Sequence, residues 1–256
     1  MRAIHPAWAV FEYYLTTYRR VWRGTVFSSF VLPVLFFLGI GLMVGEYVDR
    51  GGALPVPYTQ FIGPGLLAFT GVQIALMEAG YPVMGGFKWN KTYYAITAAP
   101  PRVRDIVAGQ LCYIGLRTAV ATVAFLVVMF PFGVVSQGWA VLAPPVALLM
   151  ALAVAAPMMA FAATVEKDTS LALLFRFALL PMMLFSGVFF PLEQLPELLR
   201  PVAYLLPLWH GVELCRAAVV GLAPSWPVGL HLAYVVVWVL SGFLAAVARF
   251  QRRLVR

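Results

Sequence analysis

Six long apolar stretches, each close to the length of a membrane-spanning helix, dominate this sequence. They cover residues 25–45, 61–80, 105–130, 140–163, 169–190 and 228–248. A helix needs about 20 apolar residues to cross a bilayer, where its backbone must satisfy its own hydrogen bonds. Only 11% of the 256 residues are charged, against about 25% in soluble domains. The sequence therefore predicts an all-α integral membrane protein with six transmembrane helices, folded as a single domain over residues 1–256.

The positions of the positive charges predict the orientation of these helices. The two chain ends and the segments after the second and fourth stretches hold most of the Lys and Arg residues, among them Lys88 and Arg104. The alternate segments hold only Arg50, Arg200 and Arg216. Because positive segments stay inside, both termini are predicted to be cytoplasmic in a multi-pass plasma membrane protein. The net charge of +8 then reflects topology and gives no indication of nucleic-acid binding.

Residues 6–23 form an amphipathic helix ahead of the first stretch. Trp8, Phe11 and Trp22 recur on one helical face, and Arg19 and Arg23 lie on the other. Aromatic and basic residues in this arrangement suit a helix that lies in the plane of the lipid headgroups. The segment is predicted to anchor the protein at the interface, and it could also contact a cytoplasmic partner.

Prolines interrupt the apolar segment between the fifth and sixth stretches. Pro191, Pro196, Pro201 and Pro207 recur every five or six residues, so no single helix can pass through them. The pieces are too short to cross a bilayer but remain apolar. Residues 191–222 are therefore predicted to form two short external re-entrant helices, followed by another break at Gly221–Pro227. The turns of this segment are predicted to depend on Pro196, Pro201, Pro207 and Gly211.

This segment also carries a family resemblance. The runs that carry it are Phe185-Ser186-Gly187-Val188-Phe189-Phe190-Pro191, Leu195-Pro196, Leu206-Pro207-Leu208 and Glu213-Leu214-Cys215-Arg216. Together they resemble the C-terminal signature of ABC transporter type 2 permeases, in particular the group of nodulation lipo-oligosaccharide and daunorubicin-resistance exporters. The resemblance implies a homodimer or heterodimer of permeases and a separate ATPase subunit. It also implies outward movement of an amphipathic substrate, such as a lipid-linked saccharide, a lipid or a drug.

The segment 81–104 is the predicted contact for that ATPase. The chain has no G-x-x-x-x-G-K-[ST] loop that could bind ATP, so ATP and Mg²⁺ are expected on the partner, and no cofactor on this chain. A short helix is predicted from Lys88 to Ala99. By resemblance, the coupling residues are Lys88, Lys91, Thr92, Arg102, Arg104 and Asp105. The family usually has acidic residues where Lys88 and Asn90 stand, and a basic loop held at anionic headgroups would also explain the charges.

Two arginines fall inside predicted spans. Arg117 lies about 17 Å into the third stretch, at 1.5 Å per residue, and Arg176 lies nearer the inner face. A central Arg costs about 2.5–3.5 kcal/mol on insertion, so each must face protein or water. Each could form a structural ion pair, with Glu78 or Asp168 as partner, or attract an anionic substrate headgroup along the transport path.

Polar and aromatic residues near the external segment are predicted to form a gate or substrate path. They are Phe189, Phe190, Trp209, His210 and Glu213, and the aromatic ones could equally form the interfacial belt of a membrane protein. One His and one Glu do not make a metal site, which needs three or four ligands.

Two other functions remain open from the sequence. An intramembrane lipid-modifying enzyme would use His210, Glu213 and Arg117. A secondary transporter would need membrane acids for ion coupling, and Glu78 is the only acid well inside a predicted span.

Overall fold

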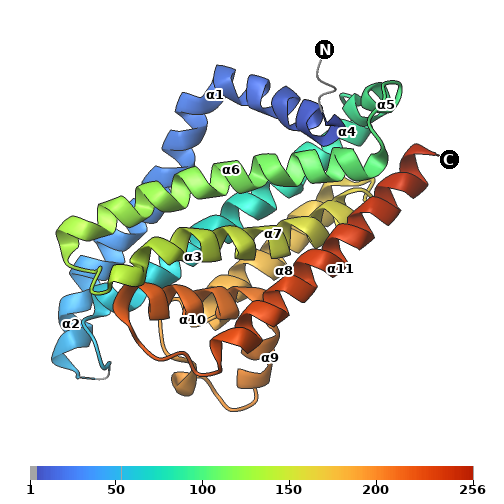
Figure 1. Cartoon of the computed structure of the whole chain (residues 1–256). Helices are drawn as coiled ribbons and strands as arrows, with labels where there is room; N and C mark the ends of the chain where they lie inside the picture. Colours follow the sequence, from blue (N-terminus) through green and yellow to red (C-terminus); the bar gives the residue numbers. More distant parts are fainter. Residues whose placement is uncertain (1–4, 53, 256) are drawn as a thin grey trace.

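The computed structural model describes residues 5–52 and 54–255 as a bundle of helices (Figure 1). Within these residues, five helices are long and apolar enough to cross a membrane. They are α3 (Tyr58–Ala79), α6 (Val103–Met129), α7 (Ala143–Ala162), α8 (Asp168–Phe185) and α11 (Val228–Leu254). Each coincides with a predicted apolar stretch, and the described residues contain no strand. The all-helical fold predicted from the sequence is therefore confirmed, and the five long apolar helices are consistent with a membrane protein.

The first helix, α1 (Pro6–Phe36), contains both the predicted interfacial helix 6–23 and the first part of the predicted span 25–45. It continues into a π-helix, Phe37–Val44, and then into α2 (Gly45–Arg50). Figure 1 shows that α1 changes direction: its first part lies across the start of α6, and its later part runs along the bundle. The side chains of residues 25–30 lie outside the described part, so the sixth span over 25–45 stays a prediction.

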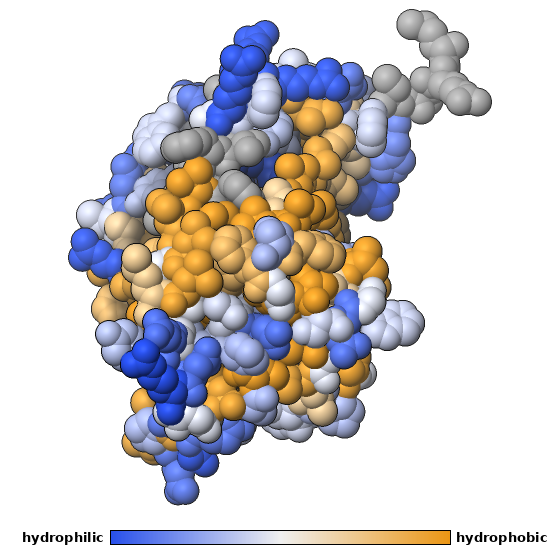
Figure 2. Space-filling view, turned by 90° about the vertical axis from the view of Figure 1, so that its left-hand side faces the viewer, coloured by the Kyte–Doolittle hydropathy of each residue, from blue (hydrophilic) through white to orange (hydrophobic). Residues whose placement is uncertain are grey.

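The start of α1 and the end of α11 lie at one end of the bundle, beside α4 (Tyr81–Lys88) and α5 (Thr92–Thr97) (Figure 1). We call this the terminal end. The opposite, distal end holds α2, α9 (Arg200–Leu205) and α10 (Pro207–Val220). Segments 81–104 and 191–222 thus lie at opposite ends of the bundle, as the charge pattern predicts. In the view of Figure 2, hydrophobic side chains gather across the middle of the molecule and hydrophilic ones border them above and below.

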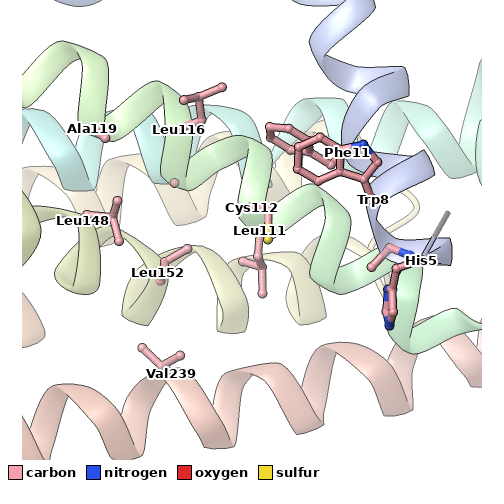
Figure 3. Close-up of a pocket in the computed structure, with 12 residues that line it drawn as sticks. His5, Trp8, Phe11, Leu111, Cys112, Leu116, Ala119, Leu148, Leu152 and Val239 are labelled. Atoms are coloured by element: carbon pink, nitrogen blue, oxygen red, sulfur yellow. Dashed lines mark hydrogen bonds between the residues drawn. The ribbon is translucent and has the colours of Figure 1, made fainter. Parts of the chain in front are cut away.

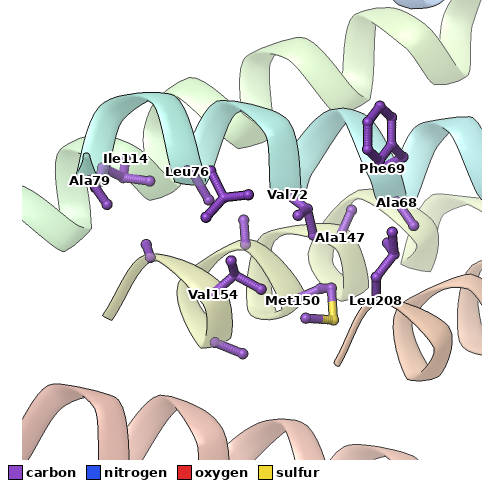
Figure 4. Close-up of a cluster of buried hydrophobic side chains, with 14 of the residues drawn as sticks. Ala68, Phe69, Val72, Leu76, Ala79, Ile114, Ala147, Met150, Val154 and Leu208 are labelled. Carbon is purple, nitrogen blue, oxygen red and sulfur yellow. The ribbon is translucent and has the colours of Figure 1, made fainter. Parts of the chain in front are cut away.

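Close packing of α3 against α7 forms the centre of the core. Ala68, Val72 and Leu76 of α3 meet Ala147, Met150 and Val154 of α7, and all six are buried (Figure 4). The helices approach so closely that a Cβ on Gly71 would lie 3.0 Å from the carbonyl oxygen of Ala147. Small residues permit this approach, which is typical of helices that associate within membranes.

The helix ends differ from the predicted span boundaries in two places. The fifth stretch is predicted to run to residue 190, but α8 ends at Phe185, and Gly187 follows with φ of 72°, a conformation that favours glycine. The sixth stretch is predicted to end at residue 248, but α11 continues through the basic tail to Leu254. Arg253 secures this extension because it donates to the carbonyl oxygen of Ala163 at 2.7 Å.

The two predicted distal helices are present as α9 and α10. They separate at Leu206, where ψ of 122° is extended, and Pro207 begins α10. The predicted contribution of Gly211 to a turn is wrong, whereas the predicted break at Gly221 is present, because α10 ends at Val220. Gly211 lies inside α10, where a Cβ would come within 2.7 Å of the Met150 side chain, so the residue serves close packing against α7. Whether α9 and α10 re-enter the membrane stays a prediction.

Candidate functional site

A basic and aromatic surface covers the terminal end at α4 and α5. Lys88, Trp89, Lys91 and Tyr94 are exposed there, and Trp89 keeps 53% of its surface accessible. The short helix predicted from Lys88 to Ala99 is present but shorter: α4 ends at Lys88, and α5 covers only Thr92–Thr97. Lys91 between them has φ of 52°, which is uncommon for a residue other than glycine and frequent at functional sites. We call Lys88, Trp89, Lys91 and Tyr94 the coupling surface.

The other predicted coupling residues have different surroundings. Asp105 is buried and accepts from the backbone N–H of Arg102 at 2.9 Å, so it caps the start of α6. Arg102 and Arg104 are exposed, while Thr92 is half-buried at the start of α5. Asp105 is therefore a structural residue, and Arg104 remains accessible to a ligand or partner.

Two hydrogen bonds connect α5, which carries Tyr94 of the coupling surface, to α1 and α6. The buried Tyr93 hydroxyl donates to Gln110 Oε1 at 2.6 Å, and the Tyr14 hydroxyl donates to the same oxygen at 3.2 Å. Burial raises the pKa of both tyrosines, so both hydroxyls keep their protons at neutral pH. We call these three residues the Tyr–Gln cluster. Sequence analysis missed it, although a Gln within an apolar helix signals a need for polar partners.

An ion pair joins the coupling surface to α8. Lys88 Nζ lies 3.0 Å from Asp168 Oδ1, at the first residue of α8. Asp168, a predicted partner of Arg176, thus pairs with Lys88. Both side chains are about half exposed, so the pair contributes little stability, but it positions the end of α4 beside α8.

Arg117 forms an ion pair with Glu78, as one of the two interpretations of the sequence predicts. Both side chains are largely buried, and the pair joins α6 to the terminal end of α3. The Arg117 guanidinium also lies 5.3 Å from the centre of the Tyr18 ring on α1. Helices α1, α3 and α6 therefore meet at Arg117, and the carboxylate of Glu78 offsets the cost of burying its positive charge.

A cleft of about 220 Å³ opens between α1, α3 and α8. Apolar side chains form most of its wall, including Phe36, Phe69, Met183 and the predicted gate residue Phe189, and Gln73 is its one polar residue among those described. Arg176 is exposed on α8 and lies seven residues before Met183, which places it on the same helical face toward the terminal end. The cleft could accept an apolar chain, with a basic residue nearby for an anionic group.

A buried arginine organises the distal end, and sequence analysis did not select it. Arg216 on α10 donates to the carbonyl oxygen of Gly187 at 2.8 Å and pairs with Glu213 at 3.3 Å. Glu213 also accepts from the backbone N–H and hydroxyl of Ser225 at 2.7 and 2.8 Å. Burial lowers the pKa of Arg216 to about 10, so it stays charged at neutral pH. Glu213 is thus engaged in holding two loops.

His210 joins α10 to α11. Its Nδ1 lies 2.9 Å from Nδ1 of His231, and its Nε2 lies 3.1 Å from the carbonyl oxygen of Tyr204. A carbonyl can only accept, so Nε2 of His210 carries a proton, and Nδ1 of neutral His210 accepts from His231. Trp209 is buried beside this pair and contacts Tyr204, while Phe190 packs on the same small cluster. Trp209, His210 and Phe190, which are predicted gate residues, thus belong to a packed contact that joins α9, α10 and α11, and we call the His210–His231 pair the latch.

Comparison with known proteins identifies the relatives of this chain. The ABC-2 type transporter family matches residues 6–220. The chain belongs to the ABC-2 type transporter family. Curated relatives include nodulation protein J of Rhizobium leguminosarum bv. viciae, which is 26% identical over 97% of this chain and 95% of its own length. The nodulation protein J sequences of Neorhizobium galegae and Rhizobium leguminosarum bv. trifolii are 25% and 28% identical, over 96% and 88% of this chain and 93% and 84% of their own lengths.

Membership of this family identifies the chain as a transport membrane subunit rather than the ATPase, with several apolar helices as expected of a bacterial inner-membrane protein. The positions of the residues predicted for a lipid-modifying enzyme do not favour that function. His210, Glu213 and Arg117 each engage different partners, and Arg117 pairs with Glu78 at the terminal end of α3. Within the described residues, no group of three His, Cys, Asp or Glu side chains could hold a metal ion.

Proposed function

We propose that this ABC-2 permease moves an amphipathic molecule outward across the bacterial inner membrane, powered by a separate ATPase subunit. The observation that carries the proposal is the connection between the coupling surface and the helices of the cleft. The Tyr–Gln cluster ties the surface to α1, and Lys88 ties it to α8 through Asp168. Movement of α4 and α5 by a partner would therefore reach two of the three walls of the cleft.

The terminal end is proposed to face the cytoplasm. The basic residues of the coupling surface and of the last turn of α11, Arg252 and Arg253, lie there, in keeping with the positive-inside rule. Exposed Trp89 and Tyr94 beside Lys88 and Lys91 suit a protein partner, because aromatic side chains supply much of the energy of protein interfaces. The partner is proposed to be the ATPase, which carries ATP and Mg²⁺. The cleft would then open toward the membrane between the two ends.

A second permease, identical or related, is proposed to cover α8. This helix is little buried by the rest of the chain, and Leu173, Phe177, Leu180 and Leu184 are exposed along it. Apolar side chains are compatible with lipid, but the cleft beside them needs a further wall to enclose a substrate. Arg176 on this helix would attract an anionic group while the apolar cleft holds a chain.

The relatives support the choice of substrate class. The relatives are named for nodulation, and residues 185–216 resemble those of nodulation lipo-oligosaccharide exporters, so a lipo-oligosaccharide is the first candidate to test. Lipids and drugs with an apolar chain and an anionic or polar head share the chemistry that the cleft and Arg176 would recognise.

Charge reversal at the coupling surface tests the proposal. We expect Lys88→Glu with Lys91→Glu to abolish co-purification with the ATPase, while Arg200→Glu at the distal end leaves it unchanged. A second variant, Gln110→Leu, should retain the ATPase but lower the amount of substrate moved per ATP hydrolysed, because Tyr93 and Tyr14 lose their shared acceptor. Undiminished co-purification of the Lys88 and Lys91 variant, or its loss in the Arg200 variant, would contradict the proposal.

A further inference from the structure

A second cavity of the molecule, separate from the cleft, lies beneath the first part of α1. It is a groove of about 720 Å³ bounded by α1, α6, α7 and α11 (Figure 3). The rings of Trp8 and Phe11, whose centres are 5.1 Å apart, cover one side. Leu116 of α6 and Leu148 and Leu152 of α7 border the space beneath them. Neither the proposed transport path nor the coupling surface uses this groove.

The size and chemistry of the groove fit a lipid chain. Its volume falls in the range of about 300–1,000 Å³ that is typical of small-molecule sites. Along α6 it extends from Leu111 to Ala119, eight residues or about 12 Å, which is most of one leaflet of a hydrocarbon core about 30 Å thick. Apart from His5 and Cys112, its wall is apolar, so it offers dispersion contacts and little hydrogen bonding.

The positive charge at one end of the groove indicates the headgroup. Arg104 precedes Leu111 by seven residues and Gly115 by eleven, so all three lie on one face of α6. Its side chain is 64% exposed, and its nearest acidic group, Asp105, is 4.0 Å away. This places an exposed cationic group, only weakly paired with Asp105, about 10 Å beyond Leu111 toward the terminal end. His5 borders the same end of the groove (Figure 3), and Trp8 is 57% exposed, as aromatic residues at the headgroup level are.

We propose that an anionic phospholipid occupies this groove, with an acyl chain beneath Trp8 and Phe11 and its phosphate at Arg104. The lipid supports the first part of α1 from below and so holds in place the helix that carries Tyr14. Its assignment to the cytoplasmic leaflet, whose surface is negative, rests on the proposed orientation of the permease. Arg104 is thereby assigned to the lipid, whereas Lys88 and Lys91 remain with the ATPase.

The test measures lipid binding to the purified chain by native mass spectrometry, with phosphatidylglycerol and phosphatidylcholine as probes. Gly115→Leu fills the groove, since a Cβ there meets only Leu152 and Leu148, at 3.8 and 3.9 Å, and the larger side chain extends into the space. Val127→Leu, at an exposed apolar position farther along α6, is the matched control. We expect Gly115→Leu to weaken phosphatidylglycerol binding by roughly tenfold or more through lost chain burial. Val127→Leu should bind as the wild type does, and Arg104→Gln should lose the preference for phosphatidylglycerol over phosphatidylcholine.

The natural cysteine in the groove gives an independent measurement in the wild-type protein. Cys112 is exposed in the groove, whereas Cys215 is buried. Phosphatidylglycerol should slow the reaction of Cys112 with a membrane-soluble maleimide, and Arg104→Gln should raise the lipid concentration needed for this protection.

Three results would overturn the inference: equal lipid binding by all variants, no protection of Cys112, or a change of oligomeric state in Gly115→Leu, which would assign the groove to a second copy. None of these measurements involves the ATPase or transport. Failure of the export proposal would therefore leave the lipid result standing, and the reverse also holds.

Discussion

The contact between α1 and α6 allows a matched pair of glycine substitutions on one helix. A Cβ at Gly109 would lie 2.6 Å from the carbonyl oxygen of Ala7 and 2.7 Å from Cβ of Val10, so α1 must shift in Gly109→Ala. A Cβ at Gly115 meets only side-chain atoms at 3.8 Å or more. Both substitutions gain roughly 0.5–1 kcal/mol of helix stability, which cancels between them. The overpacking cost of about 1–3 kcal/mol remains for Gly109→Ala alone.

Thermal unfolding of the two variants in the same detergent measures this difference. At roughly 2–4 °C per kcal/mol for a chain of this size, Gly109→Ala should unfold at least a few degrees below Gly115→Ala. We also expect it to move less substrate per ATP, because displacement of α1 separates Tyr14 from Gln110. Equal melting temperatures would refute the reasoning, since they would mean that α1 does not lie on α6 at Gly109.

Two further predictions concern buried polar groups. Glu78→Gln removes the carboxylate that pairs with the buried Arg117 and should lower the free energy of unfolding by about 3 kcal/mol. Glu46→Gln, in an exposed pair with Arg50, should change it by less than about 1 kcal/mol, and similar unfolding temperatures of the two variants would contradict this. Burial beside His231 lowers the pKa of His210 from 6.5 to about 4, so the unfolded chain binds more protons between these values. The neutral His210 of the folded chain therefore leaves the free energy of unfolding highest above about pH 6.5, and this free energy falls as the pH decreases toward 4. The wild type should therefore lose more thermal stability between pH 7 and pH 5 than His210→Gln, and identical losses would disprove the role of this pair.

The sequence predicts most of the fold because the features that decide it are local. Apolar length and interrupting prolines locate the long helices, and Pro207 begins α10 as expected. Helix ends are less certain because they depend on tertiary contacts. The positive φ of Gly187 ends α8 early, and the contact of Arg253 with Ala163 extends α11. Gly211, which looks like a helix break, serves instead as a packing surface for Met150.

The candidate site is predictable in part. Basic residues of the coupling surface and the pairing of Arg117 with Glu78 follow from the cost of placing charge near a membrane. The Tyr–Gln cluster does not follow, because Tyr14 and Gln110 are 96 residues apart and either could have met another partner. The latch between His210 and His231, 21 residues apart, likewise depends on how α10 packs against α11.

Transport into inside-out membrane vesicles tests the central claim most directly. Vesicles that contain the permease and its ATPase would be given ATP and a fluorescent lipo-oligosaccharide, and the amount of probe protected in the lumen would be measured. We predict accumulation that requires ATP and both subunits, and that is lost when Lys88 and Lys91 are changed to Glu. Accumulation without ATP or without the ATPase subunit would contradict the assignment of this chain as the permease of an ATP-driven exporter.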